Sequence, residues 1–391
     1  MTKLLMVGHS YVVTLNRRLC QEVALAGGPE LDVTVAAPAS FQGDLGPIQL
    51  ESPENEPFKL VGIPTSLSKI PHVFSYGRAL KKLLQGQRWD IVHVWEEPYI
   101  FAGAQLAWWT PPRSTLIYSS FQNQPKKYPP PFNLFERYCL KRAAGWTAFG
   151  DTVAHNLKDR PGYRERPSRT IPVGVDLDVF QPDAMARQRV LASLGWKEEG
   201  PPIIGYLGRF VPQKGLPMLM RVLNRLDPTT WRAMIVGGGA MEAELREWAS
   251  RFGDSVKIVT GVNHDEVPAH LNAMDLLVAP SQTTPAWREQ FGRMLVEAMG
   301  VGVPIVASDS GEIPNVVSNA GLIIPEADES AWVIALQRLL QNRAQRHELR
   351  VRGRTRAKET FAWPTVAQQY LDFFMQLREG SQRISETQAR S

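Results

Sequence analysis

Residues 280–304 read PSQTTPAWREQFGRMLVEAMGVGVP and are the most informative stretch of this 391-residue chain. Glu289 lies in a loop just before a helix that is predicted to begin near Phe291, and Glu297 lies two turns into that helix. Two carboxylates at this spacing can accept hydrogen bonds from different sugars of one extended ligand, and the helix N-terminus between them favours a diphosphate. The alternative is that Glu289 only stabilises the helix N-terminus and that Glu297 is a surface residue.

Two earlier strand-to-helix loops point to the same kind of ligand. Residues 205–215 read GYLGRFVPQKG, so Arg209 and Lys214 share one loop, where two cations and free backbone donors can meet a phosphate. Solvated basic residues on a connecting loop are the alternative. Residues 236–242 read VGGGAME and do not match G-x-G-x-x-G, because the last position is a glutamate. We interpret this run as a tight turn, in which Gly238 either lets the backbone approach a ligand or serves geometry alone.

Apolar runs alternate with helix-length amphipathic segments from end to end, which is typical of βα units around parallel sheets. The first series of predicted strands comprises residues 3–7, 32–36, 58–62, 91–94, 115–119, 145–148 and 168–171. The second series comprises residues 203–208, 232–236, 256–260, 276–279, 304–307 and 321–324. The pattern predicts an α/β protein with two doubly wound, Rossmann-like domains joined by a hinge within residues 172–193. Open sheets of this kind bind ligands beyond the carboxyl ends of their strands.

The composition excludes several classes of protein. A chain with 43% apolar and 21% charged residues is globular, which rules out disorder or collagen-like repeats for most of its length. Two cysteines, Cys20 and Cys139, are too few for a disulfide framework or a four-ligand zinc site and fit a reducing compartment. The start lacks a secretory signal, and no apolar run approaches the about 18 residues that span a bilayer. We therefore expect a cytoplasmic protein that is soluble or peripheral to a membrane.

Several short motifs together resemble the retaining glycosyltransferase family 4, which has the GT-B fold. Besides E-x7-E at Glu289 and Glu297, the matching pieces are FG at 291–292, GVP at 302–304, GE at 311–312, the phosphate loop GRF at 208–210 with KG at 214–215, the interdomain segment GVD at 174–176, and FAW at 361–363. The resemblance implies two domains that face each other across a cleft. It assigns 1–178 plus 370–391 to the acceptor-side domain and 179–369 to the nucleotide-sugar-binding domain.

The resemblance also implies a role for each matching residue. Glu289 would face the donor hexose, and Glu297 would bind the nucleotide ribose. Arg209 and Lys214 would clamp the diphosphate, whose charge grows as the glycosidic bond breaks. The predicted catalytic residues are Glu289, Arg209 and Lys214. The predicted donor-binding residues are Gly8, Gly208, Arg209, Lys214, Gly238, Val262, Glu289, Gln290, Phe291, Gly292 and Glu297.

Retention of configuration implies either a double displacement or a front-face reaction through an ion pair. The resemblance favours the front-face route, in which the leaving phosphate oxygen helps to take the acceptor proton; Glu289 as a nucleophile is the alternative. Asp176-Leu-Asp178 mimics the D-x-D motif of metal-dependent transferases but lies in the interdomain segment. Since Arg209 and Lys214 already supply positive charge, we predict no metal ion and no cofactor besides the donor substrate.

The first half of the chain departs from the family pattern. Many members carry His-x-His after the fourth strand, with the second histidine near the reaction centre. Here His93 matches the first and is a candidate acceptor or cleft residue, and a tryptophan occupies the second position. Glu96 or Glu97 is the candidate substitute, and acids on a solvated loop are the alternative. After the first strand, Gly8 permits close backbone approach, while His9 either faces the acceptor or diphosphate or only packs within its loop.

The net charge of +5 is concentrated in one segment. Residues 113–172 carry 11 Lys and Arg against 4 Asp and Glu, whereas residues 1–112 carry 9 against 10 and residues 173–391 carry 24 against 25. Within the basic segment, residues 126–142 join cations with aromatic residues, a composition suited to lying against anionic lipid at the inner face of the plasma membrane. The alternative is a buried amphipathic helix with a basic outer face. No nucleic-acid partner is predicted.

Three functional classes fit these motifs. The leading interpretation is a metal-independent, retaining hexosyltransferase that transfers glucose from UDP-glucose to a saccharide or lipid-linked acceptor in polysaccharide or glycoconjugate synthesis. UDP-glucose is favoured because uridine donors are common in the family that the chain resembles. The alternatives are a GT-B sugar-nucleotide epimerase and a catalytically silent protein that binds nucleotide sugars.

Overall fold

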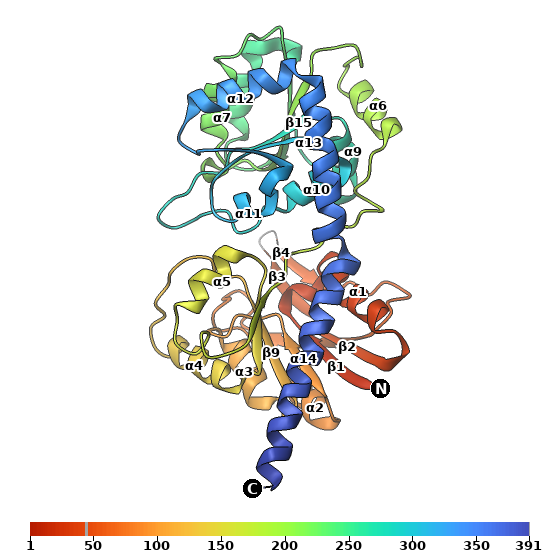
Figure 1. Ribbon diagram of the computed structural model, residues 1–391, viewed down its shortest axis with the longest axis vertical. Helices are drawn as coiled ribbons and strands as arrows, with labels where there is room; N and C mark the ends of the chain where they lie inside the picture. Colours follow the sequence, from red (N-terminus) through yellow and green to blue (C-terminus); the bar gives the residue numbers. More distant parts are fainter. Residues whose placement is uncertain (44–45, 391) are drawn as a thin grey trace. The chain divides into compact units, whose positions relative to one another are not determined.

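The chain folds into two units, each built on its own parallel sheet. The computed structural model describes residues 1–43 and 46–390, with side chains up to residue 383. Unit 1 comprises Met1–Pro172 together with the chain from Trp363 onward, and unit 2 comprises Val173–Ala362 (Figure 1).

The chain passes from unit 1 to unit 2 after residue 172 and returns to unit 1 after residue 362. These two points lie six and seven residues before the boundaries that we expected after residues 178 and 369. The first changeover comes early because the Val175 amide donates to the Phe361 carbonyl at 2.7 Å, which ties Val175 to unit 2. The second comes early because Val366 and Ala367 are fully buried in the core of unit 1.

Unit 1 is built on a sheet of seven parallel strands in the order β11-β10-β9-β8-β1-β2-β5. The strands are β1 (Thr2–Val7), β2 (Leu31–Pro38), β5 (Lys59–Ile63), β8 (Ile91–Val94), β9 (Thr115–Ser120), β10 (Gly145–Ala148) and β11 (Ser168–Thr170). All seven predicted strands of the first series are confirmed within a few residues. The inner strands read as unbroken apolar runs because a parallel sheet is covered on both faces. Two hairpins were not predicted, β3 (Ser40–Gly43) with β4 (Gly46–Gln49) and β6 (Thr65–Ser66) with β7 (Ser75–Tyr76).

Helices cover the unit-1 sheet, and the last of them comes from the far end of the sequence. They are α1 (Arg18–Gly27), α2 (Arg78–Gly86), α3 (Phe101–Trp109), α4 (Phe132–Arg142), α5 (Asp151–Lys158) and α14 (Trp363–Arg390). α14 lies beside α1 (Figure 1), and its Tyr370 and Phe374 share one core with Leu19 and Val23 of α1. The return of the chain thus completes the hydrophobic core of unit 1.

α4 is the helix that the sequence placed either against lipid or against the protein. It buries Cys139 and Leu140 and exposes Arg137 and Lys141, as expected of an amphipathic helix with a basic outer face. The same outer face also exposes Leu134, at 55%. Among the described residues, no helix is long and apolar enough to cross a membrane.

Unit 2 contains a second parallel sheet, of six strands in the order β14-β13-β12-β15-β16-β17. The strands are β12 (Ile203–Arg209), β13 (Arg232–Gly238), β14 (Val256–Val259), β15 (Leu276–Ala279), β16 (Ile305–Ser308) and β17 (Gly321–Ile324). The helices are α6 (Ala184–Ser193), α7 (Leu216–Leu223), α8 (Glu242–Ala249), α9 (Val267–Asn272), α10 (Arg293–Val301), α11 (Ile313–Val317), α12 (Glu329–Gln341) and α13 (Arg343–Arg356). All six predicted strands of the second series are confirmed, and so are the two Rossmann-like sheets of the expected fold class.

The packing of α14 predicts a large loss of stability when Phe374 is truncated. Phe374 is fully buried, so Phe374→Ala leaves a cavity, and we expect the free energy of unfolding of unit 1 to fall by about 3–5 kcal/mol. Hydrogen exchange of the β1 amides measures this change. Glu379→Ala, an exposed position on the same helix, is the matched control. Equal exchange in the two variants would contradict the role of α14 in the core.

Candidate functional site

An ion pair lies at the carboxyl edge of the unit-2 sheet. Lys214 Nζ is 2.5 Å from Glu289 Oε2, and the two side chains are only 13% and 7% exposed. Ser281 Oγ donates to the same carboxylate oxygen at 3.0 Å, and Lys214 Nζ lies 5.0 Å from the centre of the Trp287 ring. The structure therefore brings together two of the three predicted catalytic side chains, which are 75 residues apart in the sequence.

Two glycines let the loops around this pair approach each other. Gly215 has φ +79°, and a Cβ there would lie 1.8 Å from the carbonyl oxygen of Pro280. Gly311 has φ +58°, and a Cβ there would lie 2.0 Å from the carbonyl oxygen of Glu289, which accepts a hydrogen bond from the Glu312 amide at 3.1 Å. A larger residue at either position would push the loops apart, so these glycines fix the backbone that carries the pair.

Arg209, the third predicted catalytic residue, is the last residue of β12 and its side chain is exposed. Its carbonyl accepts a hydrogen bond from the Tyr206 hydroxyl at 2.8 Å, which fixes the backbone at the strand end. Burial and the nearby charge of Glu289 raise the pKa of Tyr206, whereas the charge of Arg209 lowers it. The charges of Glu289 and Arg209 therefore both act on the Tyr206 hydroxyl. Among the described residues, Arg209 forms no ion pair, which leaves its guanidinium available for an anion.

The N-terminus of α10 follows Glu289 directly. Gly292 takes a left-handed conformation at the N-cap, with φ +80°, and Phe291 is buried with its ring 6.1 Å from that of Phe361. Gln290 is exposed. Residues 290–292 therefore turn the chain into the helix next to the Glu289 carboxylate. A helix N-terminus in this place favours an anionic ligand.

Glu297 is not a surface residue, which excludes the alternative that the sequence left open for it. It lies on α10 and is 7% exposed. Burial raises the pKa of Glu297, and Arg293, whose Nε is 3.9 Å away, opposes that shift. A carboxylate held in this way can accept hydrogen bonds from hydroxyl groups of a bound ligand.

The remaining predicted donor-binding positions of unit 2 lie at the same edge. Gly208 is in β12, Gly238 ends β13, and Val262 follows β14 and is half-buried. The glycine turn differs from expectation in one respect. A Cβ on Gly238 would meet open space, whereas a Cβ on Gly237 would lie 1.9 Å from the Gly208 carbonyl oxygen. The constraint therefore falls on Gly237, where the carbonyl oxygen of Gly208 leaves no room for a side chain.

In unit 1, His9 and Glu96 form a pair at the carboxyl edge of the sheet. His9 Nδ1 is 2.6 Å from Glu96 Oε2, while Glu96 Oε1 accepts hydrogen bonds from the His9 amide and the Tyr76 hydroxyl, both at 2.6 Å. Burial lowers the pKa of His9, but the charge of Glu96 and the hydrogen bond outweigh it and raise the pKa above 6.5. The Glu96 side chain is fully buried, so His9, with 39% of its side chain exposed, is the member of the pair that a ligand can reach.

His93 does not lie where the sequence placed it. It was a candidate acceptor or cleft residue, but its ring is fully buried beneath α14, 4.9 Å from the ring of Phe374. Its Nε2 is 2.8 Å from Ser119 Oγ, and burial lowers the pKa of His93 to about 3. The histidine is therefore a neutral core residue. Gly8 also serves packing, because a Cβ there would lie 2.8 Å from Cβ of Trp95.

Glu97 is the second carboxylate at the carboxyl edge of the unit-1 sheet. Its oxygens accept hydrogen bonds from Ser120 Oγ and from the Phe121 amide, both at 2.7 Å. Burial raises the pKa of Glu97 to about 7, although these two hydrogen bonds lower it. Near neutral pH this group can hold or release a proton, which is the property expected of an acid or base that acts on a bound hydroxyl.

Several residues that position these groups had no role assigned from the sequence: Gly215, Ser281, Trp287 and Gly311 in unit 2, and Tyr76 and Ser120 in unit 1. Gly215 and Gly311 were recognised only as parts of the family motifs, without a role in bringing the loops together. The other four depend on contacts between distant segments. Among the described residues, no three His, Cys, Asp or Glu side chains come together as a metal site.

Comparison with known proteins identifies the family. Residues 12–179 match the model described as Glycosyltransferase Family 4, and residues 193–356 match the model described as Glycosyl transferases group 1. Each match falls largely in one unit, and together they cover most of the chain. This chain belongs to glycosyltransferase family 4. The resemblance carried by the E-x7-E region and the phosphate loop is thereby confirmed.

Two curated relatives of this family 4 chain are mannosyltransferases by name. One is the GDP-mannose-dependent alpha-(1-6)-phosphatidylinositol monomannoside mannosyltransferase of Mycolicibacterium smegmatis, 34% identical over 221 residues, which are 54% of this chain and 57% of the relative. The other is the lipopolysaccharide core biosynthesis mannosyltransferase LpsB of Rhizobium meliloti, 28% identical over 302 residues, which are 73% of this chain and 83% of the relative. The chain spans a little over half the length of the first curated relatives that it matches.

A solved structure supports the fold of this family 4 chain. Anabaena Alr3699/HepE, solved in complex with UDP, matches with a TM-score of 0.73 over 96% of this chain and 100% of that chain. The two sequences are 18% identical, so the match bears on the fold alone. It confirms the expected GT-B-like fold class.

The His9–Glu96 pair predicts that the pKa of His9 falls when the charge of Glu96 is removed. Since Glu96 is what raises the pKa of His9, Glu96→Gln should bring it below 6.5, because only the effect of burial remains. NMR titration of the histidine ring protons measures this value, with Glu51→Gln, an exposed acid of the same unit, as the control.

Because the pKa of His9 is raised in the folded state, the stability of the protein depends on pH. The pair contributes stability that is fully present below pH 6.5 and is lost as the pH rises through the folded pKa of His9. An unchanged His9 titration in the Glu96→Gln variant would contradict this assignment.

Proposed function

We propose that this chain is a retaining, metal-independent hexosyltransferase that moves a hexose from a nucleoside diphosphate sugar to a saccharide or lipid-linked acceptor. The observation that carries the proposal is the group of Arg209, Lys214 and Glu289 at the carboxyl edge of the unit-2 sheet, next to the N-terminus of α10. The arrangement offers two cations for a diphosphate and a carboxylate for sugar hydroxyl groups.

In the proposed reaction, Arg209 and Lys214 contact the diphosphate and stabilise the charge that develops on it as the glycosidic bond breaks. Lys214 is paired with Glu289 in this structure, so in the complex it lies between that carboxylate and the diphosphate, or leaves the carboxylate for it. Glu289 accepts hydrogen bonds from the hexose, and buried Glu297 accepts them from the ribose. The acceptor hydroxyl attacks from the face that the diphosphate leaves, and a phosphate oxygen takes its proton.

The proposed acceptor contacts are His9 and Glu97 of unit 1. His9 is oriented by Glu96 and remains partly exposed. Glu97, with a pKa raised to about 7, can hydrogen-bond an acceptor hydroxyl in either protonation state near neutral pH. We place no acceptor role on His93, since it lies in the core.

The names of the relatives bear on the donor and the acceptor. The sequence favoured UDP-glucose, whereas one relative is GDP-mannose-dependent and both transfer mannose by name. We therefore propose GDP-mannose as the first donor to test, with UDP-glucose second. The same names, which refer to phosphatidylinositol monomannoside and to lipopolysaccharide core, support a glycolipid acceptor.

A donor panel tests the proposal. Incubation with GDP-mannose, UDP-glucose or ADP-glucose should release the nucleoside diphosphate only when a glycolipid acceptor is present, fastest with one donor, and excess chelator should leave the rate unchanged. Chromatography of nucleotides and lipids measures both products. An epimerised donor without transfer would replace the proposal by an epimerase, and donor binding without release by a silent binding protein.

Substitution of Lys214 should act on the chemical step. Lys214→Gln removes a cation that faces the charge developing on the leaving group, and we expect kcat to fall by at least about 100-fold with a smaller change in KM. Lys257→Gln is the matched control, because Lys257 on β14 pairs only with the exposed Asp254 among the described residues. A raised KM with unchanged kcat in Lys214→Gln would mean that Lys214 only binds the donor, contrary to the mechanism.

A further inference from the structure

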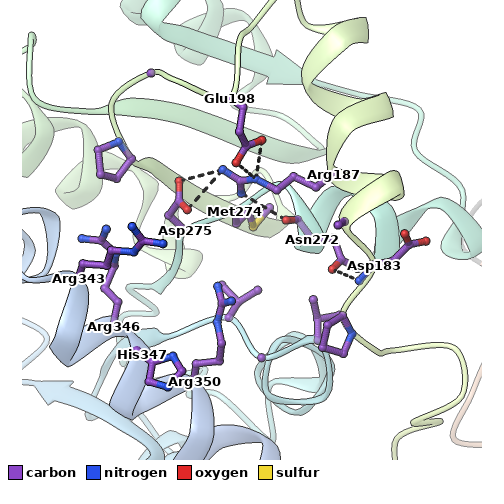
Figure 2. Close-up of a pocket in the computed structure, with 17 residues that line it drawn as sticks. Asp183, Arg187, Glu198, Asn272, Met274, Asp275, Arg343, Arg346, His347 and Arg350 are labelled. Atoms are coloured by element: carbon purple, nitrogen blue, oxygen red, sulfur yellow. Dashed lines mark hydrogen bonds and ion pairs between the residues drawn. The ribbon is translucent and has the colours of Figure 1, made fainter.

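A cavity of about 570 Å³ lies at the opposite, amino-terminal edge of the unit-2 sheet (Figure 2). Its wall includes Pro202, just before β12, Asp275, just before β15, and Val303, two residues before β16. Arg209 and Glu289, by contrast, lie at or beyond the carboxyl ends of β12 and β15. The cavity is therefore separate from the proposed donor site.

Three arginines of α13 line this cavity. Arg343, Arg346 and Arg350 are spaced three and four residues apart, which places them on one face of the helix. Their side chains extend from α13 toward the cavity, and Arg187 of α6 borders it from the other side (Figure 2). Burial lowers the pKa of Arg346, and among its charged neighbours Asp275 raises it while Arg343 and Arg350 lower it. Like charges thus repel one another along this face.

The acidic residues of the cavity form their hydrogen bonds and ion pairs with groups other than the α13 arginines. Asp275 accepts a hydrogen bond from the Ile203 amide at 2.8 Å and lies 3.5 Å from Arg187. Glu198 accepts two hydrogen bonds from Arg187, at 2.8 and 3.0 Å. Asp183 caps α6. Within the part of the chain that the structure describes, none of the three α13 arginines forms an ion pair.

A purely structural role accounts for only one of these arginines. Arg346 donates to the carbonyl oxygens of Leu339 and Leu340 and so holds the end of α12. Arg343 and Arg350 donate no hydrogen bond to any described residue. Two guanidinium groups therefore line the cavity without a protein partner in the described chain.

We propose that this cavity binds a soluble anion that carries phosphate groups. Guanidinium groups match the planar, bidentate geometry of phosphate recognition, and a bound anion would relieve the repulsion along α13. The volume is within the range of small-molecule sites, about 300–1,000 Å³. Arg343 and Arg350 start about 10 Å apart along the helix axis, and their long side chains can converge, so each guanidinium group can meet one of two adjoining phosphate groups.

Titration with inorganic pyrophosphate tests the proposal. Isothermal titration calorimetry of the full chain, at an ionic strength held constant with sodium chloride, should show saturable binding that is tighter than that of inorganic phosphate. The double variant Arg343→Gln/Arg350→Gln should weaken it by at least about tenfold, because both unpartnered guanidinium groups are lost. Arg338→Gln/Arg352→Gln removes the same charge from exposed positions outside the cavity and should bind as the wild type does.

One further variant and one further measurement keep the outcomes distinct. Arg209→Gln should leave cavity binding unchanged, since that residue belongs to the carboxyl edge. The melting temperature of Arg343→Gln/Arg350→Gln without ligand should not fall, because like charges have been removed, and this shows that the variant folds.

Four results would overturn the proposal. They are the absence of saturable binding at constant ionic strength, equal affinity in wild type and Arg343→Gln/Arg350→Gln, equal weakening in Arg338→Gln/Arg352→Gln, and loss of all binding in Arg209→Gln. The last result would assign the pyrophosphate to the donor site.

Discussion

The ion pair between Lys214 and Glu289 is the interaction on which the arrangement of the unit-2 edge depends. It joins the loop after β12 to the loop after β15 through two mostly buried charges. Removing one partner of a buried pair leaves the other charge without compensation, at a typical cost of about 3–5 kcal/mol. Gly215 permits the close approach of these two loops, and Gly311, in the loop after β16, permits a close approach to the carbonyl oxygen of Glu289. Residues that would bind a donor are thus held in place before any donor arrives.

The carboxyl edges of the two sheets carry different chemistry. In unit 2 the edge presents cations beside a helix N-terminus, which is suited to a diphosphate. In unit 1 the edge presents a histidine held by a carboxylate and a second carboxylate whose pKa is near neutrality, which is suited to hydroxyl groups. A transferase needs both kinds of surface, and the division between the units agrees with the proposed division between donor and acceptor.

The two sheets could be predicted because their strands are buried on both faces and read as continuous apolar runs. The E-x7-E spacing and the phosphate loop likewise pointed to the residues that meet in unit 2. His93 lies inside the predicted strand 91–94, so its burial follows from that strand, but its contact with α14 could not be predicted, because this helix begins 270 residues later in the sequence. The contact between Lys214 and Glu289 and the cavity beside α13 could not be predicted either. Each depends on segments that are distant in the sequence and carry no local signal of their proximity.

The proposed reaction requires that Arg209 and Lys214 form the diphosphate site. A crystal structure with the nucleoside diphosphate product bound tests it most directly. We expect phosphate oxygens within ion-pair distance of both Arg209 and Lys214, with the Lys214 ammonium shared with or released from Glu289. A diphosphate bound away from both residues, with Lys214 still paired only with Glu289, would contradict the account.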